Sequence, residues 1–139
     1  MLKRVYKDQR GMAALWAAVI MMVMLALAGL VADGGIMIYN KIRLEAATDS
    51  AAHATREAYD RELWNNYGIV ELDPLQAMLY AQIMLSENFP EAILESCEVD
   101  PINKDTATVK TRIEVETVFM KIFGIDKRII RSTVYNKVS

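Results

Sequence analysis

The dominant pattern in the sequence is an uninterrupted apolar stretch near the N-terminus. No charged residue occurs from position 11 to position 32. At about 1.5 Å per residue, a helix of this length crosses a hydrocarbon core of about 30 Å, and its internal hydrogen bonds leave no backbone group unpaired in lipid. The pattern therefore predicts a transmembrane helix over residues 11–32.

The charges on either side of this stretch predict its orientation. A basic leader, residues 1–10, holds four basic side chains and one acid, whereas the chain after the stretch begins with Asp33 and is net acidic as far as Glu62. By the positive-inside rule, the leader is cytoplasmic. We expect a single-pass protein of the cytoplasmic (inner) membrane whose C-terminal part is periplasmic or extracellular. The alternative is a secretory signal peptide cut after residues 26–28, but the apolar run continues past that point.

Residues 33–63 predict that the helix continues outside the membrane. No proline occurs before Pro74 and helix formers dominate this segment, although Gly34 and Gly35 are a weak point that would allow a bend. Small or apolar side chains recur at steps of three and four and so share one face. We call this face the small-residue seam; it comprises Leu44, Ala47, Ala51, Ala54 and Ala58. Small side chains let another helix or sheet approach closely, so this face is either a surface for a partner or an intramolecular packing face.

Residues 64–139 predict a small α+β domain that opens with a short strand, 69–72, and a second helix. Asp73 is suited to the N-cap and Pro74 to the first helical position, and the helix should end near Asn88. Its predicted apolar face comprises Leu75, Met78, Leu79, Ile83 and Leu85.

The period of the apolar positions then changes to that of strands. Residues 93–99 form a short segment with strand propensity, residues 106–119 alternate strictly, and a last strand runs over about 127–138. We expect a three-stranded antiparallel meander packed by the helices. The apolar loop cluster between the last two strands, Phe119, Met120, Ile122 and Phe123, is interpreted as a core cap at a hairpin. Contact with a partner or a membrane surface is the alternative.

Composition and motif content exclude several classes of protein. With 139 residues and a net charge of −2, the chain offers one modest domain and no basic surface for nucleic acid. The single cysteine, Cys97, cannot form an intramolecular disulfide, and the single histidine, His53, lies far from it in sequence. No hydrolase, zinc-protease, P-loop or dinucleotide signature occurs. We predict a protein that is not an enzyme, with no cofactor, metal or small-molecule substrate.

Three segments in a fixed order carry a resemblance to a known family. They are Arg10-Gly11 followed by Met12-Ala13-Ala14-Leu15-Trp16-Ala17, then Ala28-Gly29-Leu30-Val31-Ala32-Asp33-Gly34-Gly35, and then Leu44-Glu45-Ala46-Ala47-Thr48-Asp49-Ser50-Ala51-Ala52. Over roughly residues 10–55 the chain resembles the TadE/TadG-like family. Its members are the pilus-assembly proteins and minor pilins (pseudopilins) of the tight-adherence type IV pilus systems.

The resemblance implies roles for particular residues. Asp33, Gly34 and Gly35 correspond to the family's motif at the membrane exit. Asp49 joins the small-residue seam, and because it lies with Ala51 and Ala52 in the family's recurring motif, the resemblance slightly favours a partner surface for the seam. The Gly11–Met12 junction is the candidate for prepilin-type processing, but the glutamate that such pseudopilins carry five residues later is replaced by Trp16. The departure favours an uncut anchor, as in the TadG-like branch.

The resemblance also implies a function. We expect a non-enzymatic envelope component of a pilus or related secretion apparatus, in contact with membrane lipid and with other pilin-like or pilus-assembly proteins in a hetero- or homo-oligomer. The alternative is a membrane-tethered binding or sensing module unrelated to pili.

Overall fold

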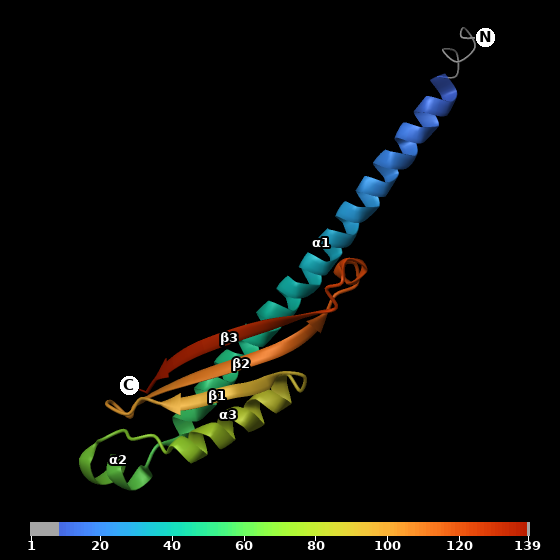
Figure 1. Ribbon diagram of the computed structural model, residues 1–139. Coiled ribbons are helices and arrows are strands. Elements are labelled where there is room, and N and C mark those ends of the chain that lie inside the picture. Colours follow the sequence, from blue (N-terminus) through green and yellow to red (C-terminus); the bar gives the residue numbers. More distant parts are fainter. Residues whose placement is uncertain (1–8, 139) are drawn as a thin grey trace, which may run out of the picture.

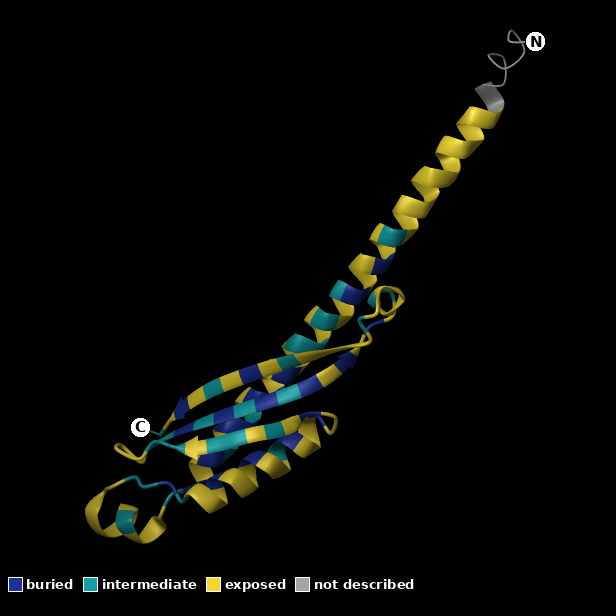
Figure 2. Ribbon diagram, in the orientation of Figure 1, coloured by how far each residue is buried: buried dark blue, intermediate teal, exposed yellow. Residues whose placement is uncertain are grey.

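One long helix organises the molecule, and its two halves have different surroundings (Figure 1). The computed structural model describes residues 9–138, so most of the predicted basic leader lies outside the described residues. Helix α1, Gln9–Ala54, is 46 residues long and passes through Gly34 and Gly35 without interruption. Its N-terminal half projects from the domain, and its C-terminal half packs against a sheet and a second helix (Figure 2).

The projecting half of α1 is apolar on every side. Its large side chains, such as Leu15, Trp16, Met22 and Val31, are all exposed. A helix with no polar face is stable within lipid or against other helices, and not in water. Among the described residues, α1 is the one helix long and apolar enough to cross a membrane, and it fits a single-pass membrane anchor.

Helix α1 ends nine residues before the predicted Leu63, which corrects the extended helix over 33–63. A short 3-10 turn, Thr55–Ala58, follows it, and Tyr59 is extended. The Asp60 carboxylate accepts the backbone N–H groups of Glu62 (2.8 Å) and Leu63 (3.2 Å), and so begins a separate helix, α2, Arg61–Tyr67. An aspartate that caps a new helix competes with continuation of the old one.

The predicted strand over 69–72 is absent. The structure has one isolated bridge there, between Tyr59 and Leu72. The Leu72 N–H donates to the Lys104 carbonyl (2.9 Å), and the Glu71 carbonyl accepts from Asp60 (2.9 Å). These hydrogen bonds to Lys104 and Asp60 pair backbone groups of Glu71 and Leu72 without a neighbouring strand.

Helix α3, Pro74–Asn88, begins and ends as predicted, with Asp73 as its N-cap, but only Leu85 of its predicted apolar face is buried. Ala77, Ala81 and Leu85 are buried, whereas Leu75, Met78, Leu79 and Ile83 are exposed. Because α3 packs against the small residues of α1, small side chains on both helices allow a close approach that larger ones would prevent.

The strands form the expected antiparallel meander in the order β1-β2-β3: Ile93–Val99, Thr106–Glu116 and Lys127–Lys137. Strand β2 lies in the centre and alternates between buried and partly exposed positions. It stops at Glu116 and not at the predicted Phe119, because the Thr117 N–H donates to the Asp126 carbonyl and the N–H groups of residues 118–120 bind Asp33 of α1. The α+β fold class is confirmed.

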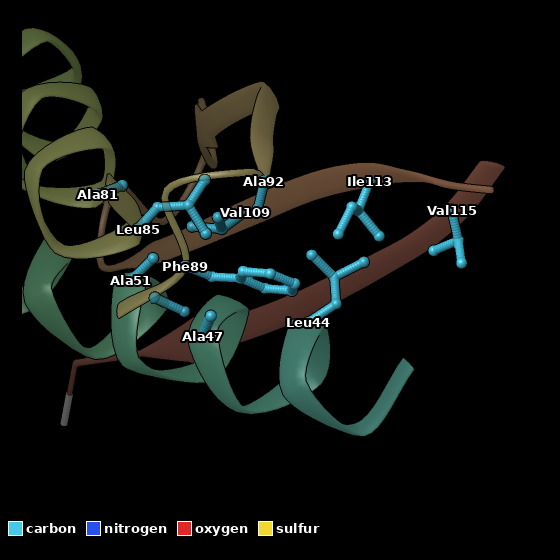
Figure 3. Packing of buried hydrophobic residues seen from close by; sticks show 11 residues of the cluster. Leu44, Ala47, Ala51, Ala81, Leu85, Phe89, Ala92, Val109, Ile113 and Val115 are labelled. Carbon is cyan, nitrogen blue, oxygen red and sulfur yellow. The ribbon is translucent and has the colours of Figure 1, made fainter. Parts of the chain in front are cut away.

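The core lies between α1, α3 and one face of the sheet (Figure 3). Leu44 of α1, Leu85 of α3, and Val109 and Ile113 of β2 meet around Phe89, which follows α3. The guanidinium of Arg43 lies 4.4 Å from the centre of the Phe89 ring. Burial of this apolar surface fixes the C-terminal half of α1 to the domain.

Candidate functional site

The small-residue seam lies inside the protein's own core. Leu44, Ala47, Ala51 and Ala58 are buried, and Ala54 is half-buried. Because these side chains already contact α3 and the sheet, the preference for a partner surface was wrong. Asp49 is exposed and does not share the buried face.

Polar contacts that sequence reasoning missed also join α1 to the sheet. The hydroxyl oxygens of Thr48 and Thr111 lie 2.6 Å apart, and both residues are fully buried. Further along, the Asn136 side-chain amide donates to the Ala52 carbonyl, and its oxygen accepts from Arg56 (2.8 Å). The sequence did contain a signal that Thr48 is buried, because Thr48 stands among the small residues of the segment 44–52 that carries the family resemblance.

Asp33 joins α1 to the loop between β2 and β3, residues 117–126, which we call the β2–β3 loop. The side chain is buried, and its two oxygens accept three backbone N–H groups, from Val118 (2.9 Å), Phe119 (2.9 Å) and Met120 (2.7 Å). Burial alone would raise the pKa of Asp33, but the three donors outweigh it and hold the pKa below the usual range. The group is therefore a carboxylate at neutral pH.

Gly29, one turn before Asp33, provides the space for this contact. A Cβ atom added at Gly29 would fall on the Phe119 ring, whereas Gly34 and Gly35 face open space. The glycine that the packing requires is thus Gly29, four residues from Asp33 and on the same helix face. The sequence contained this spacing, but not the identity of the loop that covers it.

The apolar loop cluster caps the core only in part. Phe119 and Met120 are half-buried, whereas Ile122 and Phe123, in the short 3-10 helix η3 (Met120–Phe123), are 73% and 74% exposed. The loop therefore docks on α1 by one aromatic ring and presents two other large side chains outward.

A comparison with protein families decides the nature of the long helix. The family model described as TadE-like protein matches residues 11–53. The N-terminal helix is TadE-like. The match begins at the start of the apolar span and ends at the last turn of α1, so it covers both the projecting and the buried half. No curated protein and no solved structure matches the chain.

The match confirms the resemblance over these residues, and the TadE-like family itself is a structural, non-enzymatic kind of protein related to the tight-adherence pilus. The matching family model is the TadE one, although Trp16 favours the TadG-like branch. Gly11 and Met12, the candidate processing pair, are both exposed in the first turns of the TadE-like helix.

The two side chains whose types could suit reactive chemistry are His53 and Cys97. His53 pairs with Asp49 (3.5 Å) on the exposed side of the TadE-like helix. Cys97 is half-buried in β1, and burial together with the neighbouring Glu98 raises the pKa of its thiol, which makes it a poor nucleophile. Within residues 9–138, no group of three histidine, cysteine or acidic side chains is placed to hold a metal ion.

Proposed function

We propose that this protein is a non-enzymatic, membrane-anchored component of a tight-adherence pilus or a related secretion apparatus, acting in pilus assembly or as a minor pilin. The observation that carries the proposal is the TadE-like match over residues 11–53. It is supported by an apolar helix half that is exposed on every side and continuous with a folded domain.

Lateral packing of this helix half is the proposed mode of assembly. Its exposed side chains contact lipid while the protein is in the membrane, and helices of other pilus proteins can replace that lipid. Because the seam is used inside the domain, the span and not the seam is the surface available for partner helices. The basic leader and the acidic residues after the span support a cytoplasmic N-terminus and an outer domain.

Removal of the gene followed by complementation tests the role. We expect cells without the protein to lose surface pili, as counted by electron microscopy, and the intact chain to restore them. Normal piliation without the protein would refute the proposal.

A second chain separates anchoring from specific packing. In it, residues 11–28 are replaced by leucine, which keeps a membrane span and leaves Gly29 and Asp33 in place. We expect this chain to fold and to remain in the membrane fraction, but not to restore pili. Full restoration would show that the span is only an anchor and that the side chains of the span do not pack on partners.

A further inference from the structure

We propose that the β2–β3 loop is a second membrane contact, which inserts apolar side chains into the lipid interface beside the point where α1 leaves the bilayer. The proposal depends on α1 being a membrane anchor and not on the pilus role.

The position of the loop is the first argument. It docks on Gly29 and Asp33, which are the last turn of the charge-free stretch and the first charged residue after it. Figure 1 shows the loop as the end of the sheet nearest the projecting half of α1. If residues 11–32 span the hydrocarbon core, the loop lies at the level of the headgroups.

The side chains of the loop are the second argument. Val118, Ile122 and Phe123 are all more than two-thirds exposed. Lys121 is the single charged residue within 117–125. A lysine between apolar side chains suits an interface, because its stem lies in the apolar region while its ammonium group reaches the phosphates. The next charges, Asp126, Lys127 and Arg128, lie where β3 begins, and Lys127 pairs with Glu114 (3.7 Å).

The backbone of the loop is the third argument, because unpaired polar groups are costly where water is scarce. Most N–H groups of the loop donate to carbonyl groups of the loop itself or to Asp33. The groups with such partners are those of Thr117, Val118, Phe119, Met120, Ile122, Gly124 and Ile125. The Thr117 hydroxyl also donates to the Ile125 carbonyl. A loop with this pattern can enter the interface with most of its N–H donors paired.

The test measures the depth of single nitroxide labels in the full-length protein, reconstituted in phosphatidylglycerol–phosphatidylcholine vesicles at a high lipid-to-protein ratio. Cys97→Ser provides a cysteine-free chain, and Phe123→Cys and Ile122→Cys place labels on the loop. The matched control is Ile102→Cys, because Ile102 is 87% exposed in the turn at the opposite end of the sheet.

We expect labels at 122 and 123 to be more accessible to oxygen than to a water-soluble nickel chelate, and the label at 102 to show the reverse. Equal, water-like accessibility at all three positions would overturn the proposal. Protection from both reagents that disappears as lipid is added would also overturn it, because a neighbouring copy would then cover the loop. Circular dichroism of each labelled chain, together with Val118→Cys as a further loop position, separates a misfolded variant from a negative result.

Discussion

The hydroxyl of Thr48 in α1 lies 2.6 Å from the hydroxyl of Thr111 in β2, with neither exposed to solvent. Thr48 also donates to the Leu44 carbonyl (2.6 Å). A hydroxyl has one hydrogen, so Thr111 is the donor in the pair. This single hydrogen bond joins the TadE-like helix to the central strand.

The direction of that bond predicts unequal effects of two substitutions. Thr48→Val leaves the Thr111 hydroxyl buried without an acceptor, and we expect it to lower the free energy of unfolding by about 1–3 kcal/mol. Thr111→Val should cost less, because Thr48 keeps its bond to Leu44. Denaturant unfolding of the detergent-solubilised protein measures both, and the double variant should recover part of the loss from Thr48→Val. Equal losses in the two single variants would contradict the assigned donor.

The burial of the seam predicts the effect of enlarging Ala51. Ala51→Leu adds atoms to a filled core, and we expect a loss of about 1–3 kcal/mol of stability. Ala46→Leu is the matched control, because Ala46 lies on the exposed side of the same helix; it should change the stability by no more than about 0.5 kcal/mol. If the two variants unfold at the same denaturant concentration, the seam does not pack in the core.

We expect a larger side chain to destabilise the protein at Gly29 but not at Gly34. Gly29→Leu pushes Phe119 off α1, and we expect it to destabilise the protein by about 1–3 kcal/mol and to raise protease cleavage in the β2–β3 loop. Gly34→Ala meets open space within a helix and should stabilise it by about 0.5–1 kcal/mol. Limited proteolysis with mass analysis follows the loop, and unchanged cleavage in Gly29→Leu would argue against docking.

Asp33 should make the protein sensitive to acid. Its pKa in the folded state lies below that of the unfolded chain, about 3.9. The carboxylate therefore contributes stability that is fully present above the unfolded pKa and is lost as the pH falls through the folded pKa. Melting temperatures of the solubilised protein between about pH 6 and pH 3 should converge for wild type and Asp33→Asn at the acid end. Asp49→Asn is the control for an exposed carboxylate, and parallel curves for wild type and Asp33→Asn would exclude this contribution.

The N-terminus should remain uncut. Trp16 replaces the glutamate of processed pseudopilins, so we expect intact-mass spectrometry of protein from its native membrane to give a chain that retains the residues before Met12. A Trp16→Glu variant in the same cells is the matched comparison. A native chain that begins at Met12 would show that the tryptophan does not prevent processing.

Much of the fold was predictable because its signals are local. The apolar span, the Asp73–Pro74 helix start and the strict alternation of β2 each depend on neighbouring residues, and the three-strand order follows from short connections. The end of α1 was missed because Asp60 acts as a cap only once Tyr59 leaves the helix, and that geometry depends on its bridge to Leu72.

The site was predictable only in part, because its contacts join residues far apart in sequence. Asp33 was identified by motif, but its three donors are about 85 positions away. Apart from Leu85, helix α3 was given the wrong buried face, because hydrophobicity favours the larger side chains. The packing instead selects Ala77 and Ala81, since the facing surface of α1 is itself built of small residues.

The unbroken course of α1 through Gly34 and Gly35 couples the rotation of the anchor to that of the sheet. Each residue of a helix turns the direction of its side chain by about 100°, so the side chains of the span stand at fixed azimuths relative to Leu44 and Thr48 in the core. Contacts of Asp33 and Gly29 with the β2–β3 loop, including Phe119, also attach the helix to the domain where the helix leaves the membrane. The helix therefore does not rotate independently of the domain at that point. If a neighbouring helix packs on one side of the span, that contact also determines which edge of the sheet faces away from the axis of the assembly.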